Sequence, residues 1–287
     1  MPPRPEADPA GGEAADPSEP PAALAKAADA LSDAVARLTA GQEPTSSSAS
    51  SPESQEKRNV ASVLRGVTSG VASGAKAGGK GAVIGRSFLA DLLVTTAARL
   101  PLRDKATLLD QHPGSDTEEI ADSLEMAAAR VCGTIGAAAG GLAAAQWLAT
   151  PSLLAVPVEL AAETLLLAAV EVKLVAELHE IYDARPPGQL GDRATAYLSS
   201  WTAQRGLRAN GQSSGVAAQL ASAGTAALRK RITGRLARNL GSFLPFLAGA
   251  VIGARNNSAG TRKLSSRLRA DLVSHPLIIP SQRIIEP

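Results

Sequence analysis

The chain has 287 residues and a formal net charge of +2, and 45% of its residues are hydrophobic although only 2% are aromatic. Its single cysteine, Cys132, excludes an internal disulfide framework and a metal site built from several cysteines. The 26 Gly residues, with apolar residues that are mostly Ala, Leu and Val, favour closely packed helices, because sheets use more β-branched and aromatic side chains. We therefore predict an all-α fold, a multi-helix bundle with Gly/Ala-rich apolar helices.

Charge is unevenly distributed along the chain. Residues 1–57 contain four Lys/Arg and ten Asp/Glu, a balance of −6, whereas residues 225–287 contain eleven and two, a balance of +9. A basic end beside apolar segments is typical of proteins that bind an anionic surface, either a membrane or a nucleic acid. Aromatic residues do not interleave with the basic clusters of this end, so we expect a membrane and not a nucleic acid.

Residues 1–57 are predicted to form a disordered acidic tail, because Pro, Ala, Ser, Gly and Glu dominate and cannot bury enough apolar surface to fold alone. Within the tail, residues 22–40 are predicted to form one short amphipathic helix, which either lies on the tail or docks onto a partner or the protein's own body. Its apolar seam consists of Leu24, Leu31, Val35 and Leu38. No secretory signal peptide is visible at the N-terminus, so we expect a cytoplasmic protein.

The predicted helical domain, residues 58–273, begins with a regular spacing of glycines. Four glycines follow one another at intervals of four residues: Gly66, Gly70, Gly74 and Gly78. In a helix this spacing would place them on one face and form a groove for a neighbouring helix. A flexible glycine-rich linker over residues 66–85 is the alternative. Two resemblances to nucleotide-binding loops within residues 74–85 are rejected, because both motifs require a buried strand directly upstream.

Helices are predicted over residues 82–100, where Pro101 ends the pattern, and around residues 103–110. A capping box at residues 115–118 starts a helix that leads into the longest stretch without an ionisable side chain, residues 131–158. Gly136 and Gly140 form a small-residue pair on this helix.

The next helix, over residues 158–185, is Leu-rich and carries several charges that occupy slightly under half of its circumference. The pattern therefore predicts an amphipathic helix with one polar face. Glu159 and Glu163 are one turn apart and either share a cation or a proton, as functional carboxylates, or belong to a solvated or interhelical polar stripe. Residues 189–224 are predicted to form one or two further helices, with Tyr197 and Trp201 as packing residues.

The C-terminal part combines basic clusters with a second uncharged run, residues 239–254, that contains the pair Gly249 and Gly253. The residues predicted to contact a membrane or another anionic surface are Arg229, Lys230, Arg231, Arg235, Arg238, Arg255, Arg262 and Lys263. Residues 274–287 are predicted to be an extended tail. Residues 131–150 have the length of a membrane span. Their five strongly apolar residues, however, contribute only about −2 kcal/mol to the free energy of membrane insertion, so we expect surface binding or partial insertion.

Two segments resemble EcsC-family proteins. Residues 136–185 combine a Gly/Ala-rich helix, a proline turn, an entry similar to P-x-E-L and a long Leu-rich helix that ends near Tyr182. Residues 236–272 are similar to the closing segment of that family, in which a basic helix precedes a proline, a glycine-rich apolar segment and a final helix. The resemblance covers roughly residues 115–273, and the chain departs from the family pattern in having Asp183 where a glycine is common. It implies a bacterial, membrane-associated, non-enzymatic role without assigned catalytic residues.

The sequence thus predicts a membrane-associated accessory or interaction factor at the inner face of the cell membrane, with unassigned molecular activity. The alternative is a soluble helical adaptor that binds a protein partner, or a second copy of itself, through small-residue helix faces. No catalytic residue, metal ligand or cofactor is predicted. The glycines predicted to serve helix packing are Gly66, Gly70, Gly74, Gly136, Gly140, Gly249 and Gly253.

Overall fold

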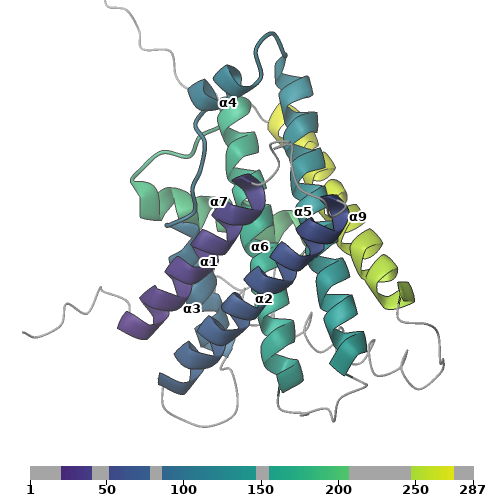
Figure 1. The fold of residues 1–287 in the computed structure, drawn as a ribbon. Helices are drawn as coiled ribbons and strands as arrows, with labels where there is room; N and C mark the ends of the chain where they lie inside the picture. Colours follow the sequence, from purple (N-terminus) through teal and green to yellow (C-terminus); the bar gives the residue numbers. More distant parts are fainter. Residues whose placement is uncertain (1–20, 41–51, 78–85, 147–154, 207–246, 275–287) are drawn as a thin grey trace, which may run out of the picture.

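The computed structural model describes residues 21–40, 52–77, 86–146, 155–206 and 247–274 (Figure 1). Most of these residues are helical, and no strand occurs among them, which confirms the predicted all-α fold. The helices are α1 (Ala22–Ala40), α2 (Pro52–Ala77), α3 (Arg86–Ala97), α4 (Lys105–Gln111), α5 (Thr117–Gln146), α6 (Ala155–Ile181), α7 (Leu190–Gln204) and α9 (Leu247–Ser274).

Helix α6 is the centre of the bundle (Figure 1). It contacts all the other helices named above, and nearly every side chain from Leu160 to Ile181 is buried. The prediction of an amphipathic helix with one polar face is wrong, because the charged side chains of α6 are buried together with its leucines and valines. Burial on all sides is possible because each of the charged groups described below meets a partner of opposite charge.

Helix α1 packs on the body of the protein, against α2, α3 and α6. Of the predicted seam, Leu31 and Val35 are fully buried, and the other two leucines are partly buried against the same core. The Ser32 hydroxyl also donates to the carbonyl oxygen of Arg99 at 2.7 Å. The predicted helix 22–40 therefore exists and docks onto its own chain, which is one of the alternatives that the sequence left open.

Helix α2 begins at Pro52, so the predicted boundary at residue 57 falls within a helix. Proline suits the first helical position because its missing N–H would have no partner there. The segment from Gly66 to Ala77 is helix and not linker, and residues 78–85 lie outside the described part of the chain. Gly66 is exposed with open space where a Cβ would lie, and at Gly70 a Cβ would meet only Ala30, at 3.8 Å. Neither glycine therefore brings two helices into close approach.

The capping box of α5 lies one residue later than the box predicted at residues 115–118. Asp116 caps the helix: its Oδ1 accepts from the backbone N–H of Glu119 at 2.8 Å, and its own N–H donates to Glu119 Oε2 at 3.1 Å. The reciprocal pattern is that of a capping box, with aspartate in the place of serine. The predicted stop at Pro151 lies outside the described residues, because α5 is described to Gln146.

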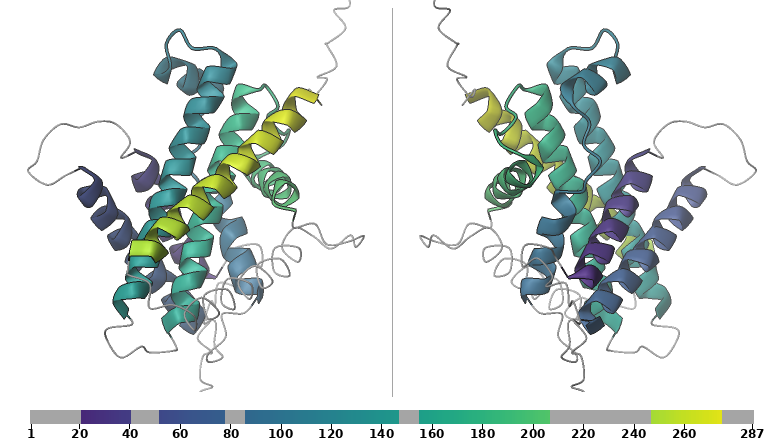
Figure 2. Two further views of the ribbon diagram at one scale, coloured as in Figure 1. Left: turned by 90° about the vertical axis from the view of Figure 1, so that its right-hand side faces the viewer. Right: turned by 90° about the vertical axis from the view of Figure 1, so that its left-hand side faces the viewer.

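Helices α5 and α9 pack with their backbones in contact at two glycines. A Cβ on Gly136 would lie 2.5 Å from the carbonyl oxygen of Gly253, and a Cβ on Gly253 would lie 2.5 Å from that of Gly136. Both distances are far below an ordinary carbon–oxygen contact, so only glycine permits this crossing. Figure 2 (left) shows the result, in which α9 crosses the outer side of α5 and α6 as a diagonal.

Candidate functional site

Three carboxylates of α6 form ion pairs inside the bundle: Glu171, Glu177 and Glu180. Each binds an arginine that lies outside α6, namely Arg205, Arg103 and Arg185 respectively. The glutamates are almost completely buried, whereas the arginines are partly exposed. The bundle therefore neutralises the charges of its central helix with cations that reach in from its rim.

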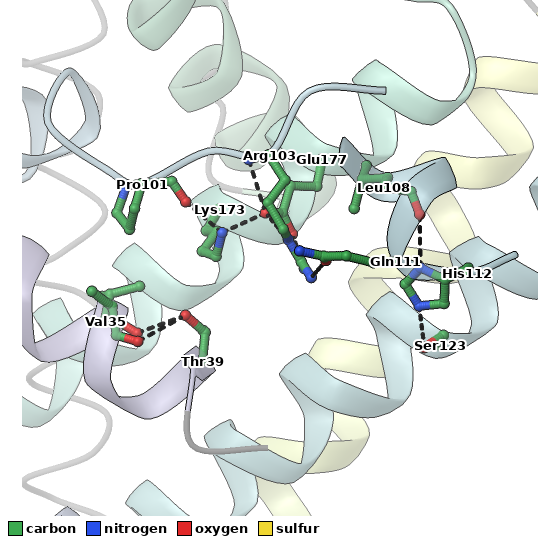
Figure 3. Close-up of polar contacts among 11 residues, drawn as sticks. Val35, Thr39, Pro101, Arg103, Leu108, Gln111, His112, Ser123, Lys173 and Glu177 are labelled. Atoms are coloured by element: carbon green, nitrogen blue, oxygen red, sulfur yellow. Dashed lines mark hydrogen bonds and ion pairs between the residues drawn. The ribbon is translucent and has the colours of Figure 1, made fainter. Parts of the chain in front are cut away.

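Glu177 holds the segment between α3 and α4 against α6 (Figure 3). Arg103 donates from Nε to Oε1 at 2.9 Å and from Nη2 to Oε2 at 2.8 Å, a bidentate pair. Lys173 donates to the same carboxylate and, at 2.5 Å, to the carbonyl oxygen of Pro101. Burial alone would raise the pKa of Glu177, but the hydrogen bonds and charges of Arg103 and Lys173 hold it below its usual value of 4.5.

Glu171 connects α6 with α7 and α9. Trp201 Nε1 donates to its Oε2 at 2.9 Å, Thr261 Oγ1 donates to its Oε1 at 2.8 Å, and Arg205 binds both oxygens. Thr261 belongs to α9, so a single buried carboxylate positions the last helix against the centre of the bundle. Cys132 lies fully buried near Thr261, and burial raises the pKa of its thiol to about 11, which makes it a poor nucleophile at neutral pH.

Glu180 lies in the last turn of α6, close to its C-terminal end. Arg185 donates to both of its oxygens, and the hydroxyl of the buried Tyr197 donates to Oε1 at 3.3 Å. Burial, followed by the charge of Glu180, raises the pKa of Tyr197 to about 12. The ring of His179 packs edge-on against Tyr197, with 5.5 Å between ring centroids, and burial lowers the pKa of this histidine.

These arrangements stabilise the fold and do not resemble a reaction centre. Every one of the three carboxylates is held by hydrogen bonds from its own chain, and no group of three His, Cys, Asp or Glu in the described residues could hold a metal ion. The predicted carboxylates lie elsewhere on α6: Glu163 is buried and Glu159 half-buried, one turn apart. His112 packs between α4 and α5, with Nδ1 2.9 Å from the carbonyl oxygen of Leu108 and Nε2 3.1 Å from Ser123 Oγ (Figure 3).

The candidate functional surface is the exposed side of α9. The helix carries five Lys/Arg and one Asp, a balance of +4. Three of the cations are exposed and make neither an ion pair nor a side-chain hydrogen bond within the described part of the chain: Arg255, Arg262 and Lys263. These three are among the residues predicted to contact an anionic surface. We refer to them as the α9 basic face.

The other two cations of α9 bind neighbouring parts of the chain and hold the helix in place. Arg267 donates to the carbonyl oxygen of Gln204 at 3.0 Å. Arg269 binds Glu118 and Asp122 of α5 and also donates to the hydroxyl of Tyr182 at 3.2 Å. The sequence did not distinguish these two roles, because the carboxylates that capture Arg269 lie about 150 residues earlier in the chain.

Other predicted site residues fall in different places. Five of the cations predicted to contact an anionic surface lie outside the described residues: Arg229, Lys230, Arg231, Arg235 and Arg238. Gly140 is half-buried on α5. Gly74 and Gly249 belong to α2 and α9, but their surroundings are not described. Among the predicted packing glycines whose surroundings are described, Gly136 and Gly253 are the pair that the structure brings together.

None of the helices, as far as they are described, is both long enough and apolar enough to cross a membrane. Comparisons with protein-family models, with curated proteins and with solved structures found no match. The resemblance to EcsC-family proteins therefore stays a prediction from the sequence.

Proposed function

We propose that the protein is a membrane-associated helical accessory factor that binds anionic lipid surfaces through the α9 basic face. The proposal retains the role inferred from the sequence and assigns it to one helix. The observation that carries it is the different use of the five cations of α9. Arg267 and Arg269 contact other parts of the chain, whereas the three residues of the α9 basic face remain available to a ligand.

Electrostatics supports this assignment. Each Lys or Arg near an anionic bilayer contributes about 1 kcal/mol, so three such residues contribute about 3 kcal/mol at physiological ionic strength. That amount produces weak and reversible binding, which further contacts could strengthen.

A second candidate function is the soluble adaptor that binds a protein partner through small-residue faces. The faces at Gly136 and Gly253 are occupied by each other, which leaves them unavailable to a partner. Gly66 favours the adaptor, because it is exposed on α2 with open space around it. Charge gives the membrane the stronger support, since Arg65 is the one cation among the residues of α2 whose side chains the structure describes, 59–73.

The proposal is tested by sedimentation of the full chain with vesicles of phosphatidylcholine that contain phosphatidylglycerol. Replacing Arg255, Arg262 and Lys263 by Gln is expected to weaken binding roughly a hundredfold, as follows from the loss of about 3 kcal/mol. The matched control replaces three exposed cations of α1 and α2 by Gln, namely Lys26, Arg37 and Arg65, which changes the net charge equally. Equal effects of the two triple variants would show that net charge, and not this face, governs binding.

A further inference from the structure

The two ends of α9 differ in their surroundings. At the N-terminal end, Val251 and Ile252 are 48% and 41% exposed, and they are the only neighbouring pair among the exposed large apolar residues of the described chain. Arg255 follows one turn later. The three residues of the α9 basic face and this apolar pair thus lie within residues 251–263, from the second turn of the helix to just past its middle.

The C-terminal end of α9 lies beside acidic side chains. Arg269 is bound there by Glu118 and Asp122, both of which are more than half exposed, and Asp271 lies on α9 itself. The adjoining tip of the molecule, formed by α4 and the start of α5, adds further exposed carboxylates: Asp110, Asp116 and Glu119. An anionic bilayer would repel this end of the protein, while it attracts the other end.

The geometry points to an oriented mode of membrane binding, which rests on the function proposed above. The N-terminal half of α9 faces the bilayer, Val251 and Ile252 enter the interface between headgroups and acyl chains, and the α9 basic face contacts anionic headgroups. The acidic tip of α4 and α5 points away from the membrane. Because α9 crosses α5 and α6 as a diagonal, its N-terminal end lies away from the tip formed by α4 and the start of α5, and a bilayer that contacts the first end would not meet the acidic tip (Figure 2, left).

Helix geometry makes this orientation measurable. Val251 and Val273 fall within about 40° of each other around the helix axis, but they are separated by about 33 Å along it. Val273 is 63% exposed, more than Val251, so exposure alone predicts that it would enter the membrane at least as readily. The orientation predicts the opposite, because Val273 lies at the acidic end.

The experiment attaches an environment-sensitive fluorophore to single cysteines introduced as Val251→Cys, Val273→Cys and, on the acidic tip, Met126→Cys. The unaltered chain is the labelling control, because Cys132 is fully buried. On vesicles of phosphatidylcholine and phosphatidylglycerol, a blue shift is expected at position 251 and at neither of the other two. Equal shifts at 251 and 273 would show that α9 lies flat and would overturn the orientation, as would vesicle binding without any shift at 251.

A pair of charge variants measures the same difference by affinity. Val251→Asp is expected to weaken vesicle binding roughly tenfold, because it removes apolar area from the interface and adds a negative charge beside anionic headgroups. Val273→Asp is the matched control and is expected to leave the affinity unchanged. Failure of the full chain to bind vesicles would refute the proposed function itself. A fluorescence response at 251 to a nucleic-acid duplex and not to vesicles would overturn the choice of partner.

Discussion

Replacement of Glu171 by Ala removes the acceptor on which α6, α7 and α9 converge. Trp201, which is 8% exposed, would retain a buried donor without a partner, and the fully buried Thr261 would keep only its hydrogen bond to the carbonyl oxygen of Asn257 at 3.1 Å. An orphaned donor of this kind costs about 1–3 kcal/mol. The side chain of Arg205 is 31% exposed, so its guanidinium can recover hydration and adds less than a fully buried cation would. We expect the free energy of unfolding to fall by about 3–4 kcal/mol.

The assay is urea unfolding followed by far-ultraviolet circular dichroism, with Asp33→Ala on the exposed side of α1 as the control. The control should change the free energy of unfolding by less than about 0.5 kcal/mol. Glu171→Gln should lose less than Glu171→Ala, because its amide oxygen still accepts a hydrogen bond. A loss below about 1 kcal/mol for Glu171→Ala would refute the view that this carboxylate ties the three helices together.

Gly253→Ala should lower stability by about 1–3 kcal/mol in thermal melts, because its Cβ would lie 2.5 Å from the carbonyl oxygen of Gly136. Gly66→Ala, in open space on the same kind of element, should instead raise stability by up to about 1 kcal/mol. The lowered pKa of Glu177 adds stability that is present above its usual value of 4.5 and disappears as the pH falls through the folded-state pKa, so Glu177→Gln should flatten acid-unfolding curves. Asp183 has φ of 56°, and Asp183→Val should cost about 1–2 kcal/mol more than Asp183→Asn in urea titrations.

Local sequence signals predicted the helices well. The amphipathic seam of residues 22–40, the short helix before His112 and the capped start of α5 all appear in the structure within a few residues of their expected positions. Pro101 and the Asp116–Glu119 capping box mark boundaries through backbone chemistry that needs no tertiary context. Periodicity and boundary residues therefore predicted these three elements, whereas α2 begins inside the predicted tail and α9 begins within the predicted uncharged run.

The environment of α6 could not be predicted in the same way. A helical wheel assigns charged residues to solvent, but it does not show that Arg103, Arg205 and Arg185 lie close enough to neutralise them. These arginines occupy loop and helix-end positions, where no local periodicity gives their direction. The docking of α1 was left open for a related reason, since its seam indicated an apolar contact without indicating the partner.

The candidate surface was predicted in part. Composition identified Arg255, Arg262 and Lys263 as members of a basic segment, but Arg267 and Arg269 belong to the same segment and are used internally. The contact between Gly136 and Gly253 joins two small-residue pairs that the sequence revealed separately, and the pairing itself depends on how α5 and α9 cross. Tertiary contacts therefore determine which residues remain available for binding.

The most direct test of the account is the affinity of the full chain for vesicles as the fraction of phosphatidylglycerol and the salt concentration are varied. Binding through the α9 basic face predicts little affinity for pure phosphatidylcholine, a steep increase with anionic lipid and a decrease at high salt, since screening shortens the range of the attraction. Equal affinity for neutral and anionic vesicles, or no binding to either at low salt, would contradict it.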